Sequence, residues 1–375
     1  LHLTNRRQRQ MCIRDRKRTP FYEFHKQLNA KMCPFAGYEM PISYGSIAEE
    51  HLNVRQNVGI FDVSHMGEFI VKGKNALNFI QRFSSNDASK LKAGKVQYSC
   101  ILNENGGIVD DMLVYHLPDG AYMLVVNGAN VAKDWAYLQQ FLPKQDIEFI
   151  DISEKTALLA VQGPNAAAVL QPLTDMNLGD MTYYTCQKGV FAGVEKVLIS
   201  STGYTGAGGF EVYFYAENSE HIWNSIMEVG KKVGLQPTGL AARDTLRLEK
   251  GFCLYGNDID DSTTPLEAGL GWITKTYKKN LVARDILLAQ KKNGIKQKLC
   301  GLTLLGKGIA RTGYEVLNEN GENIGRVTSG TKSPSLNKAI AMAYITTEKA
   351  VLGTEVFVKI RKKTVKAEVV KFPFL

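Results

Sequence analysis

The sequence contains no apolar run long enough to cross a membrane as a helix. The longest candidate, residues 121–132, is interrupted by Asn127 and Gly128 and is shorter than the roughly 18 residues that a span requires. The N-terminal residues also lack the apolar segment of a secretory signal. We therefore expect no association with a membrane.

Cysteine and histidine are few, and they show none of the spacings that hold metals. The six cysteines form no C-x-x-C pair, and the six histidines have no ligand spacing with them or with each other, which argues against a zinc site. Dispersed cysteines in a long chain are more often reduced thiols that pack as small apolar side chains. We expect no metal and a reducing compartment, the cytoplasm, or the mitochondrial matrix if the source is a eukaryote. The cysteines are Cys12, Cys33, Cys100, Cys186, Cys253 and Cys300.

The positive net charge is concentrated at the N-terminus. Residues 1–18 hold seven Lys or Arg and one Asp, a net +6 of the total +9, which leaves 39 basic and 36 acidic residues elsewhere. The rest of the chain is nearly balanced, so the composition does not favour a nucleic-acid partner. Because residues 1–18 lack hydrophobic periodicity, we predict a disordered basic tail that is foreign to the fold.

The 375 residues are enough for two or three domains. Residues 19–285 mix helices with hairpins, which predicts an α+β region of two interleaved lobes. Ser46 and Glu49 match the capping box of a helix that ends before Gly59. The turn sequences ENGG (104–107) and PDG (118–120) join three strands into an antiparallel meander.

The last part of the chain has a different pattern. Residues 295–375 contain short strands divided by Gly, Asn and Lys, which predicts a separate small β-barrel or sandwich. Within it, GRVTSGTKS (325–333) nearly matches a phosphate-binding loop. Thr331 separates the second Gly from the Lys, and no helix follows. We predict a turn at this position.

A glycine-rich segment, STGYTGAGGFEVYF at 201–214, raises the question of a second phosphate loop. Such a loop is followed by a helix and usually has a lysine in reach. Here an alternating strand follows, and no lysine lies in or just after the loop. We predict a turn between two strands, closed by Glu211. An alternating strand allows Glu211 to face either solvent or a partner, and both options remain open.

Two pairs of charged residues are further candidates for a site. Asp110 and Asp111 are neighbours on one strand, so they face opposite sides, and the pattern does not show which faces inward. An inward carboxylate needs a cation, a proton donor or a ligand amine, whereas a carboxylate on an edge strand needs only water. Arg243 and Arg247 lie one helical turn apart. They form either a solvated face paired with Asp244 or a site that holds a carboxylate or carbonyl.

An ordered series of motifs resembles the aminomethyltransferase family, the T-protein of the glycine cleavage system. It extends from about residue 18 to the end of the chain, and the order of the motifs is more specific than any one of them. The motifs are RTPFYEFH (18–25), FAGYEMPISY (35–44), FDVSHMGEF (61–69), GGIVDDM (106–112), LAVQGP (159–164), GYTGAGGFE (203–211), GLAARDTLRLEKGFCLYGNDID (239–260), TPLEAGLGW (264–272) and VTSGTKSPSL (327–336).

The resemblance implies a three-lobed fold around a central folate site, with the C-terminal β-barrel as the last lobe. It implies that a methylene carbon passes from the aminomethyl-lipoyl arm of the H-protein to tetrahydrofolate. Ammonia is released, and the products are 5,10-methylenetetrahydrofolate and dihydrolipoyl H-protein. Lipoylated H-protein would be the partner and tetrahydrofolate the co-substrate.

The resemblance also implies roles for individual residues. Asp111 would be the catalytic carboxylate near the folate nitrogens. Glu211 would pair with the N–H and amino groups of the pterin, and Arg243 would contact the folate. The remaining positions that match those lining the family's pterin site are Tyr98, Val125, Asn127, Met66 and Trp272.

The chain departs from the family pattern in two places. Ala207 stands where an acidic residue is usual, and the chain ends at KFPFL, whereas some relatives extend further and add a tyrosine near the folate. Related folds include demethylases, the C-terminal halves of sarcosine and dimethylglycine dehydrogenases, and iron–sulfur assembly factors that bind folate without turnover. The motifs at 255–260 and 264–272, together with Asp111, favour the aminomethyltransferase.

Overall fold

The computed structural model describes residues 16–375, so most of the predicted tail, residues 1–15, lies outside the described residues. The last three residues of that predicted tail belong to the fold. Arg16 forms an ion pair with Glu39 at 2.7 Å, and Lys17 makes an isolated β-bridge with Tyr38. The predicted boundary at residue 18 is therefore too late, because Glu39 and Tyr38 lie on a strand that holds these cations in place.

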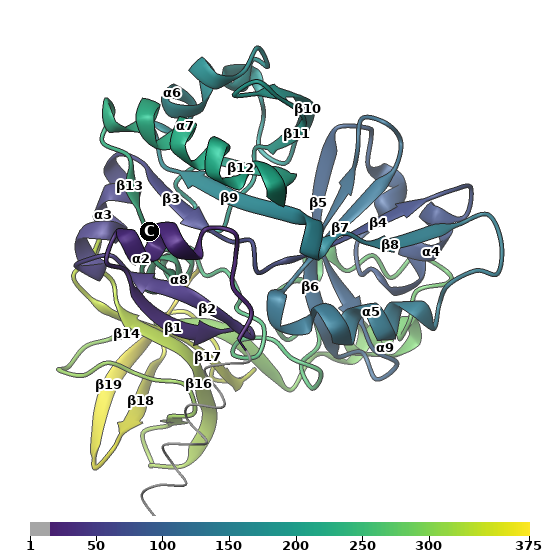
Figure 1. The fold of residues 1–375 in the computed structure, drawn as a ribbon. Helices are drawn as coiled ribbons and strands as arrows, with labels where there is room; N and C mark the ends of the chain where they lie inside the picture. The colour runs from purple at the N-terminus through teal and green to yellow at the C-terminus, as the bar shows by residue number, and fades with distance from the viewer. Residues whose placement is uncertain (1–15) are drawn as a thin grey trace, which may run out of the picture.

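The first of two large sheets has five strands, each antiparallel to its neighbours, in the order β5-β6-β7-β4-β8. The strands are β4 (Gly67–Lys72), β5 (Lys95–Leu102), β6 (Ile108–His116), β7 (Tyr122–Val126) and β8 (Glu148–Asp151). Helices α4 (Ala76–Phe83) and α5 (Val131–Gln139) cover one face (Figure 1). Phe79 and Phe83 of α4 pack there against Phe69 of β4. The predicted meander is β5-β6-β7 and is confirmed.

The second sheet has six strands in the order β10-β11-β12-β9-β3-β13. Its strands are β3 (Gly59–Asp62), β9 (Thr156–Gln162), β10 (Cys186–Phe191), β11 (Val194–Ser200), β12 (Gly209–Tyr215) and β13 (Gln236–Pro237). Helices α6 (Ala166–Leu170) and α7 (Ser219–Lys231) cover its outer face. The glycine-rich segment connects β11 to β12, as predicted, and is not a phosphate loop leading into a helix.

The chain passes between the two sheets and returns. It enters the second sheet as β3, builds the whole first sheet from β4 to β8, and comes back as β9. The faces of the two sheets that no helix covers pack against each other. Tyr115 and Val125 of the first sheet and Leu158 and Tyr213 of the second belong to one buried cluster. We call this cluster the inter-sheet layer.

A small two-stranded unit and three helices close one side of this layer. The elements are α2 (Tyr22–Gln27), β1 (Lys31–Phe35), β2 (Tyr38–Ser43), α3 (Ile47–Gln56) and α8 (Leu240–Glu249). The Ser46 side chain accepts a hydrogen bond from the Glu49 N–H and caps α3, as predicted. Gly251 follows α8 with φ of +68°, a backbone conformation that glycine adopts without strain.

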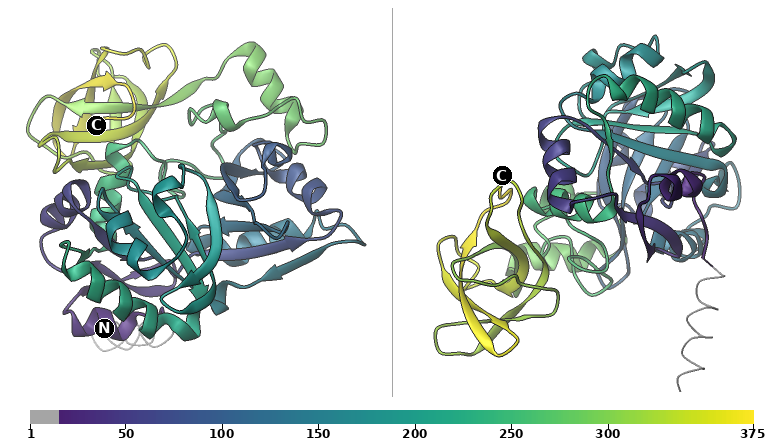
Figure 2. Two further views of the ribbon diagram at one scale, coloured as in Figure 1. Left: turned by 90° about the horizontal axis from the view of Figure 1, so that it is seen from above. Right: turned by 60° about the vertical axis from the view of Figure 1, so that its left-hand side comes forward.

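The last lobe is a closed barrel in the order β14-β17-β16-β15-β18-β19. It follows helix α9 (Arg284–Asn293) and stands beside the two sheets in both views of Figure 2. Its strands are β14 (Gln297–Leu304), β15 (Glu315–Leu317), β16 (Asn323–Lys332), β17 (Ala339–Thr346), β18 (Glu355–Ile360) and β19 (Lys363–Val370). The predicted α+β class with a C-terminal barrel is confirmed.

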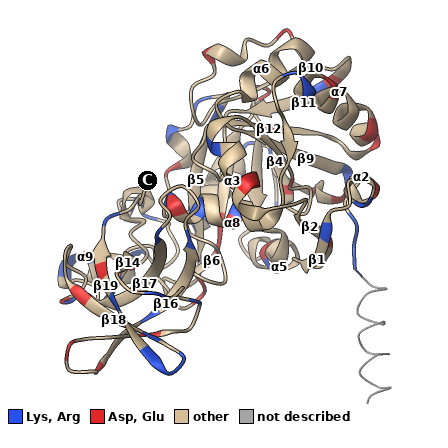
Figure 3. Ribbon diagram, turned by 90° about the vertical axis from the view of Figure 1, so that its left-hand side faces the viewer, with Lys and Arg blue, Asp and Glu red and all other residues tan. Residues whose placement is uncertain are grey.

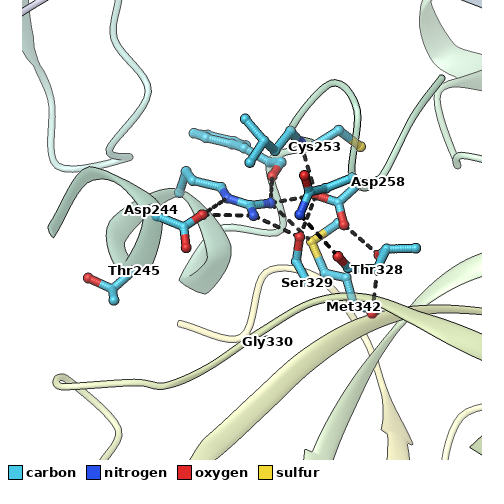
Figure 4. Close-up of polar contacts among 12 residues, drawn as sticks. Asp244, Thr245, Cys253, Asp258, Thr328, Ser329, Gly330 and Met342 are labelled. Carbon is cyan, nitrogen blue, oxygen red and sulfur yellow. Dashed lines mark hydrogen bonds and ion pairs between the residues drawn. The ribbon is translucent and has the colours of Figure 1, made fainter. Parts of the chain in front are cut away.

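The turn that we predicted at 325–333 is wrong. Most of that segment is strand β16, which pairs with β17 and has a register shift between Val327 and Ser329. At this register shift, the hydroxyls of Thr328 and Ser329 face the rest of the chain. Thr328 and Ser329 both donate to the buried carboxylate of Asp258, and these three residues converge beside the barrel in Figure 4. The polar residues that mimic a phosphate loop in the sequence therefore join the barrel to the rest of the chain.

Arg247 of α8 completes this junction. Its guanidinium lies 2.6 Å from Asp258, donates 2.8 Å bonds to Ser329 and Asp244, and is 1% exposed. We considered Arg247 as part of a solvated face or of a ligand site. Its contacts with Asp258 and Ser329 tie α8 to the barrel and its approach, so Arg247 acts as a structural arginine at the barrel interface.

Candidate functional site

Asp110 and Asp111 lie on an interior strand. Because β6 pairs with both β5 and β7, the edge-strand alternative is wrong. Asp111 shares the side of β6 that faces the inter-sheet layer, and Asp110 faces α5, where Asn130 donates to it at 2.7 Å. The strand alternation thus sends the two carboxylates into different environments.

Two side chains from neighbouring strands hold the Asp111 carboxylate. The Tyr98 hydroxyl of β5 donates to Oδ2 at 2.8 Å, and Nδ2 of Asn127, just after β7, donates to Oδ1 at 2.8 Å. Burial and the charge of Asp110 raise the pKa of Asp111 to about 7, although the bonds from Tyr98 and Asn127 act in the opposite direction. A carboxyl with this pKa exchanges a proton readily near neutral pH.

A second charged group comes from the other sheet. Glu211 of β12 accepts hydrogen bonds at Oε2 from the hydroxyls of Thr202 and Tyr213. Burial raises the pKa of Glu211, while the Thr202 bond and the nearby Arg243 charge lower it. Glu211 therefore does not take the solvent-facing option that the sequence left open. It lies in the inter-sheet layer beside an arginine.

Arg243 of α8 faces this layer from a third direction. Its guanidinium carbon lies 4.4 Å from the centroid of the Tyr204 ring, a cation–π contact. The guanidinium makes no hydrogen bond to any residue between 16 and 375. Arg243 is half-buried and close enough to Glu211 for each to affect the pKa of the other. Five unused N–H donors beside a carboxylate form a site for a planar polar ligand.

The remaining expected site residues differ in how deeply they lie around Asp111 and the Glu211–Arg243 pair. Trp272 is 63% exposed and lies 6.4 Å from Tyr98 between ring centroids, so it forms an outer rim. Val125 is buried in the inter-sheet layer, and Met66 packs against that layer. The Asn127 amide is already shared between Asp110 and Asp111, so its contacts are with the acid pair.

The charges of both Asp111 and Glu211 act on one tyrosine, Tyr184. The charges of Glu211 and Asp111 both contribute to raising the pKa of Tyr184, whose burial is the larger cause. The two carboxylates therefore act on a common region, although one comes from each sheet. The expected residues therefore face or flank the inter-sheet layer, with Trp272 at its edge.

The sequence reasoning missed Tyr204 and the buried neighbours of the site. Tyr204 stands inside the glycine-rich segment, and an aromatic residue between glycines was the available signal. His65 is 1% exposed, and its Nδ1 has no hydrogen-bond partner among the described residues. Burial and the Arg243 charge lower the pKa of His65 to about 4, so the imidazole is neutral at pH 7.

The described residues contain no group of three or more His, Cys, Asp or Glu arranged to hold a metal ion. No helix within residues 16–375 is long and apolar enough to span a membrane. In Figure 3, Lys and Arg are interspersed with Asp and Glu over the visible lobes.

Comparisons with known proteins agree with this architecture. Residues 21–278 match the model of the GCVT N-terminal domain, and residues 297–375 match that of the glycine cleavage T-protein C-terminal barrel domain. The aminomethyltransferase of Porphyromonas gingivalis is 56% identical over 360 residues, which covers 96% of this chain and 99% of the relative. That of Flavobacterium psychrophilum is 51% identical over 358 residues, with the same coverage.

A solved structure has the same fold over almost the whole chain. The crystal structure of the glycine cleavage system aminomethyltransferase T from Bartonella henselae matches with a TM-score of 0.89 and 34% identity. The match covers 96% of this chain and 98% of that one. The two matched domains, together with these aminomethyltransferase relatives, place the chain in the class of one-carbon group transferases. This chain belongs to the glycine cleavage T-protein family of aminomethyltransferases.

Proposed function

We propose that this chain transfers the methylene carbon of an aminomethyl-lipoyl group, carried by the H-protein, to tetrahydrofolate. The sulfur–carbon and carbon–nitrogen bonds of the aminomethyl group break, and two bonds form between the carbon and folate nitrogens. The two protons that leave those nitrogens equal the two that ammonia and the dihydrolipoyl thiol gain. The reaction therefore needs proton transfer but no oxidant.

Asp111 is the group in this site best suited to move a proton. Its pKa of about 7 means that the carboxylate can accept a proton from a folate nitrogen and the acid can return one to the leaving group. Tyr98 and Asn127 fix both carboxylate oxygens, so the orientation is set before substrate binds. The Asp111 carboxyl, held by the hydrogen bonds from Tyr98 and Asn127, is the observation that carries the proposal.

Glu211 and Arg243 are assigned to folate binding. A pterin presents an N–H and an amino group on one edge and a carbonyl beside them, which matches a carboxylate and a guanidinium close together. Val125 and Met66 offer apolar contact to the flat ring, and Tyr98 and Trp272 offer aromatic contact. Much of the rate then comes from holding two substrates together, an effect that reaches about 7–11 kcal/mol in favourable cases.

Lipoylated H-protein is the proposed partner, and the cytoplasm is the proposed site of the reaction. Both follow from the family, since the T-protein takes its carbon from a carrier-bound lipoyl arm. The named relatives are bacterial, which supports the cytoplasm over the mitochondrial matrix.

The test is ammonia release from aminomethyl-loaded H-protein, with and without tetrahydrofolate, for the wild type and Asp111→Asn. We expect release by the wild type to depend on folate and to fall about 100-fold or more in Asp111→Asn. Folate binding without ammonia release by the wild type would instead favour a demethylase or an assembly factor. A loss of only a few-fold in Asp111→Asn would remove Asp111 from the central role.

A further inference from the structure

A buried carboxyl on α5 lies behind the reacting site and is not used in the mechanism above. Asp134 is 0% exposed, and neither of its carboxylate oxygens accepts a hydrogen bond from an N–H or hydroxyl group of the described residues. Burying an ionised carboxylate without donors is costly. The Asp110 carboxyl is close enough to act on the pKa of Asp134 through its charge and through a side-chain hydrogen bond.

Asp110 has the donors that Asp134 lacks. Its Oδ2 accepts from the Asn127 backbone N–H at 2.9 Å, and its Oδ1 accepts from Nδ2 of Asn127 at 2.8 Å and of Asn130 at 2.7 Å. Three N–H donors favour the ionised form of a carboxyl. Two carboxyls in contact cannot both be ionised in a buried place, so the negative charge resides on Asp110.

The Asn127 amide connects this pair to the reacting carboxyl. One of its N–H bonds reaches Asp110 Oδ1, and the other reaches Asp111 Oδ1, each at 2.8 Å. The amide can donate in both directions only while Asp110 remains an acceptor in its present position. We propose that Asp134 is a protonated positioning residue that donates to Asp110 and thereby fixes Asn127 and Asp111.

The charged and titratable groups around Asp134 favour a state in which the Asp110–Asp134 pair holds one proton, on Asp134. Burial, followed by the charge and hydrogen bond of Asp110, raises the pKa of Asp134 to about 11, and Asp111 acts in the same direction. Lys133 opposes them but is held by the Val109 carbonyl at 2.5 Å and the Tyr255 hydroxyl at 2.8 Å. The first turn of α5 favours one negative charge at this point, which the pair supplies.

The protonated state can be tested without measuring activity. We would record infrared difference spectra of the full chain at about pH 9, above the pKa of Asp111 and below that of Asp134. A carboxylic-acid band that shifts in deuterated water is expected in the wild type, retained in Asp111→Asn and Glu68→Gln, and lost in Asp134→Asn. The Glu68 control is needed because that buried carboxyl also has a raised pKa. The proposal would be overturned if Asp134→Asn kept every carboxylic-acid band of the wild type.

The positioning role needs a second readout, and it rests on Asp111 being the reacting carboxyl. Asparagine at position 134 keeps an N–H donor toward Asp110, whereas leucine removes it. We expect kcat within about twofold of wild type for Asp134→Asn and about 10- to 100-fold lower for Asp134→Leu, as for a small misplacement of a reacting group. Equal losses in the two variants would contradict the role, even if Asp134 proves to be protonated.

The pH profile distinguishes positioning from a general loss of structure. Without the Asp134 donor, Asp110 takes up a proton more easily, and a neutral Asp110 no longer raises the pKa of Asp111. The acid limb of kcat/KM should therefore move to lower pH in Asp134→Leu and stay in place in Asp134→Asn. An unmoved limb in Asp134→Leu would contradict the proposal. If Asp134→Leu does not fold, the infrared comparison, which uses only the other variants, still decides the protonation state.

Discussion

The Tyr98 hydroxyl donates a 2.8 Å hydrogen bond to Asp111 across the β5–β6 ladder. This bond favours the ionised form of a carboxyl whose burial favours the acid. The two effects together leave the pKa of Asp111 near 7, where a proton carrier is most effective. Variants that remove one of these two effects should shift the pKa of Asp111, and this shift can be measured.

Removing the Tyr98 hydroxyl should make Asp111 a weaker acid. The pKa of Asp111 rises when a donor to its ionised form is lost, so the acid limb of kcat/KM in Tyr98→Phe should move to higher pH by about one unit. Tyr137→Phe is the matched control, because that hydroxyl binds the Leu102 carbonyl away from the acid pair. A limb that moves to lower pH, or equally in both variants, would contradict the assignment.

Glu211→Gln should weaken folate binding without removing the fold. Glutamine keeps the size of the side chain but presents an N–H donor to the donors of the pterin, so we expect a loss of about 10- to 100-fold in affinity for tetrahydrofolate. Isothermal titration calorimetry measures this directly. Glu195→Gln on the neighbouring strand β11 is exposed and should bind as the wild type does. Unchanged affinity in Glu211→Gln would place the pterin elsewhere.

Arg243→Met tests the second half of the proposed folate site. Methionine retains apolar contact with Tyr204 but cannot donate, and the affinity for tetrahydrofolate should fall about 10-fold or more. Arg326→Met is the control, since that arginine also lies over a tyrosine, Tyr344, at 5.6 Å but on the barrel. The same titration for both variants separates the lost ligand contact from a lost cation–π contact.

A buried carboxylate between α8 and the barrel should control stability in acid. Glu249 is fully buried and accepts bonds from Arg55, Ser333 and Ser335. Burial would raise its pKa, but the bond from His51 and the other donors lower it to about 2. The stabilisation is therefore present above the unfolded-state pKa of about 4.5 and is lost as the pH falls toward 2.

Glu249→Gln should lower the free energy of unfolding by about 3–5 kcal/mol at neutral pH, because it leaves the largely buried Arg55 cation without its counter-charge. Denaturant unfolding measures the loss. Glu355→Gln removes an exposed ion pair with Lys366 and should cost less than about 1 kcal/mol. Similar losses in both variants would show that the buried network contributes no more than a surface pair.

Glu68→Gln should change how stability depends on pH. Glu68 is buried, its oxygens accept no hydrogen bond from the described residues, and burial raises its pKa well above 4.5. The unfolded chain loses this proton above about 4.5 and the folded chain keeps it, so wild-type stability falls as the pH rises. The stability difference between Glu68→Gln and the wild type should therefore shift in favour of the variant between about pH 5 and pH 8. A constant difference would show that Glu68 is ionised in the fold.

The secondary structure followed closely from local patterns. Turn sequences between alternating segments identified the hairpins of the five-stranded sheet, and the capping residue Ser46 marked the start of α3. These features depend on residues within a few positions of each other, which is why the pattern alone predicts them. The motif order likewise pointed to the family that the comparisons confirm.

Contacts between distant segments were decided only by the tertiary structure. Nothing near Asp110 in the sequence shows that it meets Asp134 of α5, and alternation alone did not tell which aspartate faces the other sheet. The segment that contains residues 328 and 329 was predicted to be a turn, because nothing close to it in the sequence shows what its hydroxyls bind. Their partner, Asp258, is 70 positions or more away.

The sequence by itself determined most of the elements, the α+β class and the family, because short-range periodicity and turn chemistry act within each segment. Tertiary structure alone decided the ionisation states and the partners of the charged residues. Burial and the donors brought from other strands set a pKa, and both exist only when the sheets pack together.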